Sequence, residues 1–167
     1  YQRRVRGFIM TLVYVFHPNI NDSKRCKHII DRINTLQNVT VRYVPETYVH
    51  TEETILNEQE AMIKADRIVF LYPLYWSSCP GHAKTFIDKV FQLNFAFTYG
   101  RPHFAKLHMK KFRLIMTTGG PKHHFKNLQV LTCNFKETTD YVGMIMEDPF
   151  IYFSDMTEEH LSELKFE

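Results

Sequence analysis

Short apolar segments alternate with amphipathic segments along most of the chain, and this alternation constrains the fold more than any other feature. The apolar, β-branched segments predict strands at residues 11–16, 39–44, 67–72 and 111–117, with a fifth inside 143–153. The amphipathic segments predict helices at residues 23–36, 51–64 and 80–93, a short helix at 157–166, and room for another within 123–140. Strands joined through helices run parallel, so the pattern predicts a three-layer α/β domain with a five-stranded parallel sheet and helices on both faces.

The length and the charge narrow the class of protein. The 167 residues suit one domain, so we predict a single domain over residues 10–167 and an N-terminal leader or extension over residues 1–9, with Met10 as the native start. The formal net charge of +3 comes from three arginines in that extension, because the rest of the chain holds 18 basic and 18 acidic residues. A nucleic-acid-binding domain should carry a basic face, so this balance argues against one.

The cysteines and the hydropathy favour the reducing environment of the cytoplasm. Cys26, Cys79 and Cys133 form no paired motif, which argues against a disulfide framework and against a zinc site. The sequence contains no run of about 18 apolar residues, so we expect no membrane span. We therefore predict a cytoplasmic protein without a bound metal.

A ligand is expected at the carboxyl ends of the strands. In open parallel sheets, ligands bind outside those ends, at the point where the strand order reverses. The order 2-1-3-4-5, which is common in such sheets, places this point between the first and third strands, so the loops after strands one, three and four should meet in one crevice. These loops have the sequences HPNINDSK, PLYWSSCP and TTGGP, beginning at His17, Pro73 and Thr117.

Each loop suits a binding role and also a purely structural one. The first loop leads into a helix N-terminus, which attracts phosphate through free N–H groups and the helix dipole, or Ser23 is an ordinary N-cap. The second loop carries the single tryptophan between two prolines, which suits contact with a planar ring or plain packing against the sheet. The paired glycines of the third loop allow close approach to a ligand, or form a turn. Neither GxxxxGK nor GxGxxG occurs, which argues against a P-loop hydrolase and a dinucleotide-binding Rossmann site.

The run from Ala65 to Gly100 resembles the NAD(P)H:quinone reductase family of flavodoxin-like flavoproteins. Its most specific part is PLYWSSCPGHAKTFID, which begins at Pro73. VFHPNINDSK from Val15 and TTGGP from Thr117 match the same family in order and spacing. The resemblance covers most of residues 11–125 and extends to flavoproteins of the modulator-of-drug-activity and potassium-efflux ancillary types. It implies a three-layer flavodoxin-like fold.

The resemblance also implies a bound flavin, which we expect to be FMN, with FAD as the alternative. The residues that it places around the phosphate and the ribityl chain are His17, Asn19, Ser23 and Lys24. Those that it places along the isoalloxazine ring are Pro73, Leu74, Tyr75 and Trp76. Those that it places at the pyrimidine end of the ring are Thr118, Gly119 and Gly120.

The reaction of this family suggests the catalytic residues. The flavin accepts a hydride from the co-substrate NAD(P)H, the nicotinamide leaves, and a quinone takes the hydride in the same place, which is a ping-pong mechanism. Relatives often carry a tyrosine shortly after TTGG to assist charge relay, whereas here Phe125 stands at roughly that position and cannot form a hydrogen bond. We assign Tyr75, His123 and His124 as catalytic residues, with a solvated loop as the alternative reading of the two histidines.

The leading prediction is an FMN-dependent NAD(P)H:quinone oxidoreductase that acts as a homodimer. The resemblance places Phe95, Phe97 and Tyr99 at the dimer surface, with core packing as the competing account. A second hypothesis is a flavin-binding ancillary subunit of a potassium-efflux system, with little turnover and a transporter as its partner. A third is an electron-transfer flavodoxin, which should carry a strongly acidic surface that the balanced charge does not support.

Overall fold

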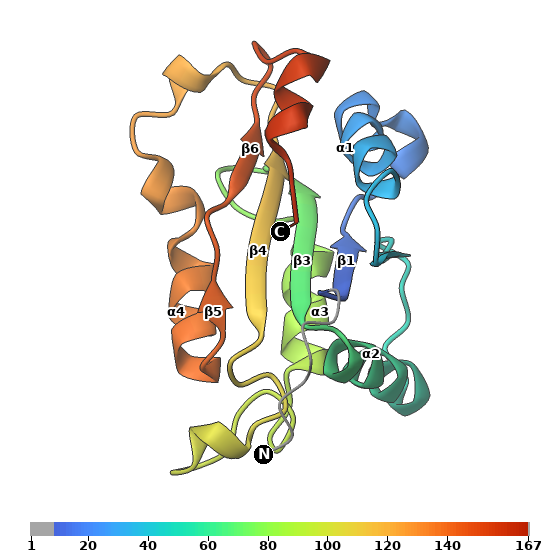
Figure 1. Ribbon diagram of the computed structural model, residues 1–167, viewed down its shortest axis with the longest axis vertical. Helices are drawn as coiled ribbons and strands as arrows, with labels where there is room; N and C mark the ends of the chain where they lie inside the picture. Colours follow the sequence, from blue (N-terminus) through green and yellow to red (C-terminus); the bar gives the residue numbers. More distant parts are fainter. Residues whose placement is uncertain (1–8, 167) are drawn as a thin grey trace.

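The strands form one parallel sheet in the computed structural model, which describes residues 9–166. Its central strands β1 (Thr11–Val15), β3 (Arg67–Pro73) and β4 (Lys111–Thr117) lie side by side, and β2 (Val39–Tyr43) forms one edge (Figure 1). The order β2-β1-β3-β4-β5 confirms the predicted strand order. Apart from Ile9, the leader expected over residues 1–9 lies outside the described residues.

The fifth position of the sheet holds two short strands, so the prediction of a single fifth strand is wrong in this detail. β5 (Ile145–Met146) pairs with the beginning of β4, and β6 (Phe150–Tyr152) pairs with its end, both in parallel. Pro149 stands between them and has no N–H group for the ladder, which accounts for the interruption.

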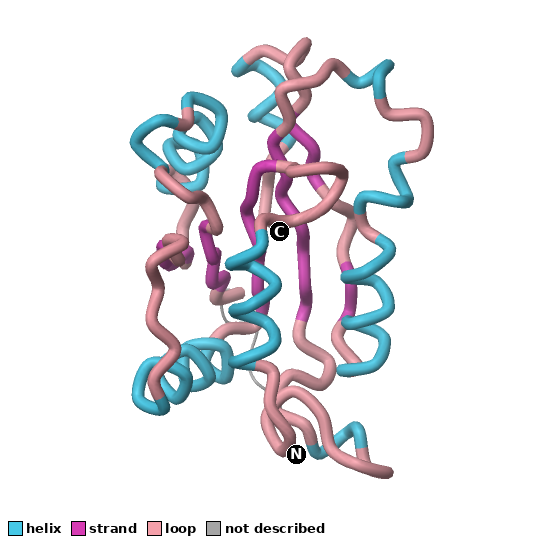
Figure 2. The backbone as a smooth tube through the Cα atoms, turned by 180° about the vertical axis from the view of Figure 1, so that it is seen from behind, coloured by secondary structure: helices cyan, strands magenta, loops and turns pink. Residues whose placement is uncertain are grey.

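Helices cover both faces of the sheet. The helices α2 (Glu52–Lys64), α3 (Gly81–Val90) and α4 (Cys133–Val142) lie on one face, which is turned toward the viewer in Figure 2. The helix α1 (Lys24–Asn34) and the 3-10 helix η5 (Glu158–Glu163) lie on the other. The remaining 3-10 helices are η1 (Ile20–Asp22), η2 (Pro102–Phe104), η3 (Lys122–His124) and η4 (Leu128–Leu131).

Local signals explain where most helices begin and end. The side chain of Ser23 accepts a hydrogen bond from the backbone N–H of Cys26, as expected of an N-cap. Thr51 caps α2 through a capping box with Thr54. The ambiguous stretch after residue 123 contains the full helix α4, which ends at Gly143 in the left-handed conformation. The last predicted helix forms only the 3-10 helix η5.

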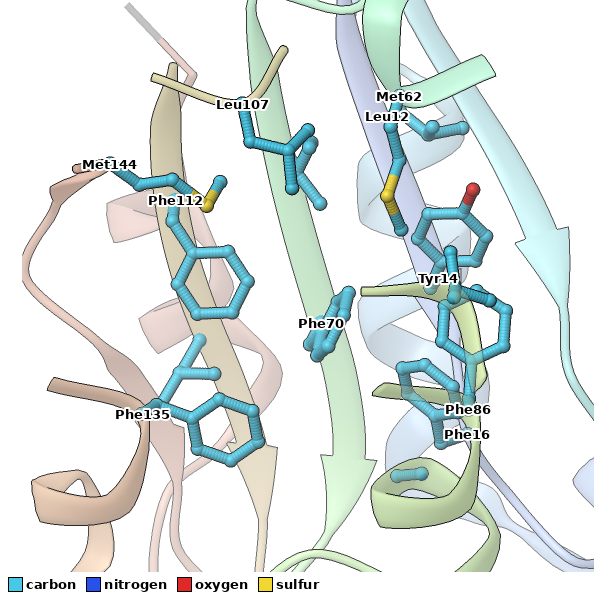
Figure 3. Packing of buried hydrophobic residues seen from close by; sticks show 14 of the residues in the cluster. Leu12, Tyr14, Phe16, Met62, Phe70, Phe86, Leu107, Phe112, Phe135 and Met144 are labelled. Carbon is cyan, nitrogen blue, oxygen red and sulfur yellow. The ribbon is translucent and has the colours of Figure 1, made fainter. Parts of the chain in front are cut away.

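The two faces of the sheet are packed with different side chains. On the α2–α3–α4 face, the strands present aromatic rings such as Tyr14, Phe70 and Phe112, which pack against Phe86 and Phe135 (Figure 3). On the α1 face, the central strands β1, β3 and β4 present aliphatic side chains, namely those of Val13, Val15, Val69, Leu71 and Ile115. Burial on both faces explains why the central strands are almost continuously apolar.

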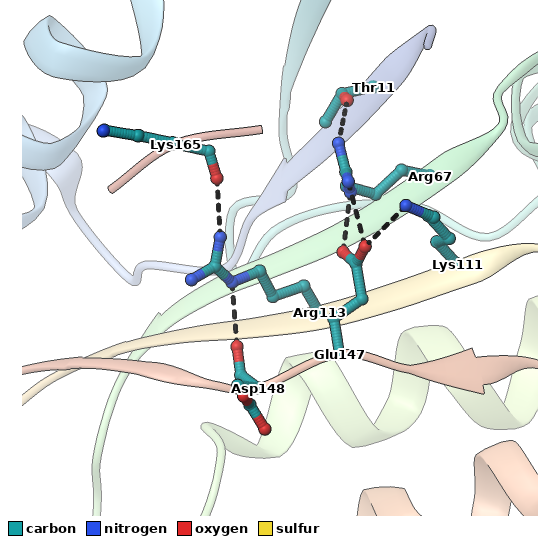
Figure 4. A network of polar contacts seen from close by, with 7 residues as sticks. All are labelled: Thr11, Arg67, Lys111, Arg113, Glu147, Asp148 and Lys165. Carbon is teal, nitrogen blue, oxygen red and sulfur yellow. Dashed lines mark hydrogen bonds and ion pairs between the residues drawn. The ribbon is translucent and has the colours of Figure 1, made fainter. Parts of the chain in front are cut away.

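The amino ends of β3 and β4 carry charged side chains that form ion pairs and hydrogen bonds within the protein (Figure 4). The Arg67 side chain is only 3% exposed, and its guanidinium donates to both carboxylate oxygens of Glu147 at 2.6 and 2.9 Å. Lys111 Nζ lies 3.2 Å from the same carboxylate. Arg113 donates to the backbone carbonyls of Asp148 and Lys165 at 2.9 and 2.7 Å, so this network ties the C-terminal segment to the sheet.

Candidate functional site

The three loops singled out in the sequence meet in one cleft at the carboxyl ends of β1, β3 and β4. The cleft has a volume of about 400 Å³. The side chains and backbone that line it are His17, Asp22, Ser23, Lys24, Arg25, Pro73, Leu74, Tyr75, Thr117, Thr118 and Gly119. Residues 17–25, 73–75 and 117–119, which are far apart in the sequence, are brought together because parallel strands present all their carboxyl ends at one edge of the sheet.

The first loop provides the start of α1. In the first turn of a helix the backbone N–H groups have no intrahelical partner, and the Ser23 hydroxyl satisfies only that of Cys26 at 3.1 Å. Lys24 follows directly and adds a positive charge. A helix N-terminus with a hydroxyl and a cation beside it is a suitable place for a phosphate group.

His17 and Asn19 have different places in this loop. Nδ1 of His17 accepts a hydrogen bond from the backbone N–H of Asn19 at 3.1 Å, and burial lowers the pKa of His17. His17 is therefore mainly neutral at pH 7 and lines the cleft. The side chain of Asn19 does not line the cleft, because it donates to Asp22 at 2.6 Å and accepts from the backbone of Asn21.

The second loop turns sharply at its tryptophan. Tyr75 and Ser78 exchange two backbone hydrogen bonds of 2.9 and 3.0 Å around a two-residue turn, in which Trp76 and Ser77 have φ values of 50° and 63°. Two left-handed residues in succession are typical of a type I′ turn. The Trp76 side chain is fully exposed and does not line the cleft, whereas Pro73, Leu74 and Tyr75 do. The predicted contact of Trp76 with a planar ring stays a prediction.

The third loop presents backbone at the cleft. Gly119 is exposed there, and a Cβ atom added to it would meet nothing within 4 Å. Gly120 turns away, because a Cβ atom on it would lie 3.3 Å from the Phe125 ring and 3.7 Å from Nδ1 of His124. Gly120 is thus a close-packing position behind the loop, while Thr118 and Gly119 face the ligand space.

The predicted catalytic residues are not brought together. Tyr75 lines the cleft, but the exposed residues His123 and His124 lie in η3 and do not. Their rings contact each other, with centroids 4.5 Å apart. Phe125, at the position where relatives often carry a tyrosine, packs on Phe153 with ring centroids 5.6 Å apart. The solvated-loop reading of the histidines fits this placement.

Three residues of the cleft were not named as site residues from the sequence: Asp22, Arg25 and Thr117. Asp22 and Thr117 lie within the predicted loops, and Arg25 follows the first loop directly, so its position beside the helix start was a usable signal. Thr117 ends β4, and its hydroxyl lies 3.5 Å from the thiol of Cys26, which joins α1 to the sheet beneath the cleft.

The aromatic residues expected at a dimer surface separate in the structure. Phe95 is 5% exposed and belongs to the core, which corrects its predicted place at the surface. Tyr99 is 77% exposed, and the half-buried ring of Phe97 lies between it and Tyr141, with centroids 5.8 and 5.7 Å away. Only part of the predicted surface is therefore accessible.

Within residues 9–166, no helix is long and apolar enough to cross a bilayer. No group of three or more histidine, cysteine or acidic side chains in that range could hold a metal ion.

Solved structures with the same architecture carry several different names. An NADPH-quinone reductase from P. pentosaceus superposes with a TM-score of 0.80 at 21% identity, covering 93% of this chain and 92% of its own. A thermophilic tryptophan halogenase from Streptomycin violaceusniger gives 0.79 at 25% identity, covering 91% and 92%. The general stress protein 14 from Treponema denticola, in complex with FMN, gives 0.79 at 22% identity, covering 92% of each chain.

The sequence also matches a protein-family model that is described as the flavodoxin-like fold. The match spans residues 10–165, which is nearly the whole described chain, and it agrees with the observed strand order and with these superpositions. The chain therefore belongs to this flavodoxin-like family.

Proposed function

We propose that this protein is an FMN-dependent NAD(P)H:quinone oxidoreductase. The observation that carries the proposal is the single cleft in which a helix start, an apolar and aromatic loop and an exposed glycine backbone face one another. The neighbours named NADPH-quinone reductase and stress protein in complex with FMN support a flavoprotein oxidoreductase. The neighbours' names differ, so the choice of reaction rests on the cleft and on the sequence resemblance.

The residues of the cleft fit the parts of a flavin mononucleotide. Ser23, Lys24 and the free N–H groups of α1 suit its terminal phosphate. Leu74 and Tyr75 offer apolar and aromatic side chains to the ring, and the open backbone of Gly119 allows the ring edge to approach closely. We propose FMN in preference to FAD because the cleft contains a single helix N-terminus, which suits one terminal phosphate.

The protein's part in this reaction is binding, orientation and electrostatics. When bound, the flavin supplies two-electron chemistry by taking a hydride from NAD(P)H and passing it to a quinone in a ping-pong sequence. We assign Thr118 and Gly119 to the pyrimidine end of the ring, where the backbone N–H of Gly119 is the donor that stabilises negative charge, because that of Thr118 is bound to the carbonyl of Tyr152. We assign Tyr75 to the orientation of the ring. His123 and His124 are left out of the proposal because they lie outside the cleft.

The test is anaerobic reduction of the FMN-loaded protein with NADPH and, separately, with NADH. The proposal expects the flavin absorption band to bleach with one nicotinamide per flavin and to return on addition of a simple quinone. In steady state, double-reciprocal plots at several quinone concentrations should be parallel. Full FMN occupancy with turnover near background would contradict the enzyme and support a flavin-binding ancillary subunit.

We also propose a cytoplasmic homodimer that uses the exposed part of the aromatic surface. Tyr99 and Tyr141 are 77% and 65% exposed on either side of Phe97. Light scattering after size exclusion should give twice the chain mass for the wild type and a reduced mass for Tyr99→Glu. A monomeric wild type at micromolar concentration would refute the dimer and leave the flavin proposal standing.

A further inference from the structure

Arg25, in the first turn of α1, holds the segment that follows β6. Its Nη1 donates to the carbonyl oxygen of Phe153 at 2.8 Å, and its Nη2 donates to that of Ser154 at 2.9 Å. The guanidinium also lies over the ring of Tyr152, 5.2 Å from the centroid. A planar guanidinium that is hydrogen-bonded at two nitrogens and stacked on a ring has one orientation. These contacts therefore fix the position of residues 152–154 relative to α1.

Residues 152–154 in turn hold the third loop of the cleft. The backbone N–H of Thr118 donates to the carbonyl of Tyr152 at 3.2 Å, and that of Ser154 donates to the carbonyl of Gly120 at 3.1 Å. These two bonds fix the loop on both sides of Gly119, which faces the cleft. Arg25 therefore connects the helix start to the glycine loop through a segment that is more than 125 positions away in the sequence.

Although Arg25 lines the cleft, its terminal nitrogens bind carbonyl oxygens of the protein. We call this connection from α1 through residues 152–154 to the third loop the bridge. Two of the residues that form it, Tyr152 and Phe153, are buried, with 2% and 4% of their surface exposed. A hydrogen bond from a charged group to a carbonyl is stronger than a neutral one, which makes the bridge a firm connection.

We infer that Arg25 is a positioning residue, which sets the third loop against the first and thereby acts on the ring of a bound flavin. The inference rests on the proposed function. The competing account is that Arg25 binds the phosphate directly as a positive charge. If Arg25 positions the third loop, a substitution at residue 25 should weaken binding of the flavin ring. If Arg25 binds the phosphate directly, it should weaken binding of the phosphate alone.

The experiment compares Arg25→Lys and Arg25→Gln with the wild type. Lysine keeps the charge but lacks the planar fork that reaches two carbonyl oxygens. The dissociation constants of FMN and of riboflavin, which lacks the phosphate, are measured by quenching of flavin fluorescence. The inhibition constant of inorganic phosphate against FMN is measured with the same signal.

Arg32 provides a matched control on the same helix. It also donates to backbone carbonyls of the C-terminal segment, those of Leu161 and Leu164 at 3.2 and 3.3 Å, but it does not line the cleft. Arg32→Lys and Arg32→Gln should leave both flavin affinities unchanged.

The positioning role predicts that both Arg25 variants weaken FMN and riboflavin by the same factor, about tenfold, which is the range for a lost hydrogen bond to a charged group. The inhibition constant of phosphate should stay the same. Loss of FMN affinity alone, restored by lysine, would overturn the inference in favour of direct phosphate binding. Unchanged affinities in both variants would overturn it as well.

Amide hydrogen exchange of the protein without flavin tests the bridge independently. The amides of Thr118 and Ser154, which donate the two bonds to and from the third loop, should exchange faster in Arg25→Gln than in the wild type and in Arg32→Gln. If the wild type binds no flavin, the proposed function fails, and the exchange rates alone decide whether the bridge exists. Equal rates in all three proteins would disprove it.

Discussion

The polar groups at the amino ends of β1, β3 and β4 are bound to one another, whereas those at the carboxyl ends face an open cleft. At the amino ends, the charges of Arg67 and Lys111 are paired with Glu147, and Arg113 is bound to backbone carbonyls. At the carboxyl ends, the helix start at Ser23 and the backbone of Gly119 face an open cleft. We infer from this difference that the amino end contributes mainly to stability and propose that the carboxyl end contributes mainly to binding, and each variant below tests this separation.

Arg67→Met should give the largest loss of stability. The substitution removes the Arg67 guanidinium from the carboxylate of Glu147. This carboxylate is partly buried, because the Glu147 side chain is only 21% exposed. Breaking such a pair typically costs about 3 kcal/mol of unfolding free energy, which urea denaturation at pH 7 measures. Lys84→Met, which breaks an exposed pair with Asp88, is the control and should cost less than about 0.5 kcal/mol. A loss below about 1 kcal/mol for Arg67→Met, or a change in FMN affinity at a temperature where the variant is folded, would contradict the separation.

Ser23→Ala should affect both stability and binding. It removes the cap of α1 and should cost about 1 kcal/mol in urea denaturation. FMN affinity should fall more than riboflavin affinity, because the hydroxyl lies where we place the phosphate. Thr51→Ala, which removes the cap of α2 away from the cleft, is the matched control. It should show the stability loss with both flavin affinities intact, and a similar flavin loss in Thr51→Ala would show that helix stability alone explains the effect.

Glu147 should make the amino end sensitive to acid. Burial alone would raise the pKa of Glu147, but the hydrogen bonds and charges of Arg67 and Lys111 outweigh it and lower that pKa. The unfolded chain therefore binds this proton more readily, so the stabilisation is complete above about pH 5 and is lost as the pH falls through the pKa of the folded state. In urea denaturation from pH 7 down to pH 3, Glu147→Gln should show a flatter decline than the wild type. Parallel curves would mean that other carboxylates cause the acid sensitivity.

Gly119→Ala should have the smallest effect on stability and a selective effect on binding. The added Cβ meets nothing within 4 Å, so the unfolding free energy should change by less than about 0.5 kcal/mol. The methyl group projects into the space proposed for the ring edge and should weaken FMN about threefold in a fluorescence titration. Gly81→Ala, which is equally unobstructed but does not line the cleft, should leave FMN affinity as it is. An equal effect of the two substitutions would remove the third loop from the site.

The periodicity of the sequence was sufficient for the parallel α/β sheet. The strand order came from the resemblance to flavodoxin-like proteins, and the meeting of the three loops follows from that order and from the geometry of parallel sheets. The cap at Ser23 was predictable, since residue type and position coincide. The split between β5 and β6 was missed, although Pro149 was a usable signal. The turn at Trp76 was not predictable, because left-handed backbone in two successive non-glycine residues runs against their conformational preferences. The bridge made by Arg25 depends on the carbonyls of Phe153 and Ser154. It was not predictable, because no local sequence pattern indicates a contact between residues so far apart in the chain.

Equilibrium titration of FMN with the purified wild-type protein shows whether the open carboxyl end of the sheet is a flavin site, as we propose. Flavin fluorescence should be quenched to saturation at one FMN per chain. Ser23→Ala should shift this titration to higher protein concentration, whereas Thr51→Ala should not. Fluorescence that stays constant throughout the wild-type titration would contradict this proposal.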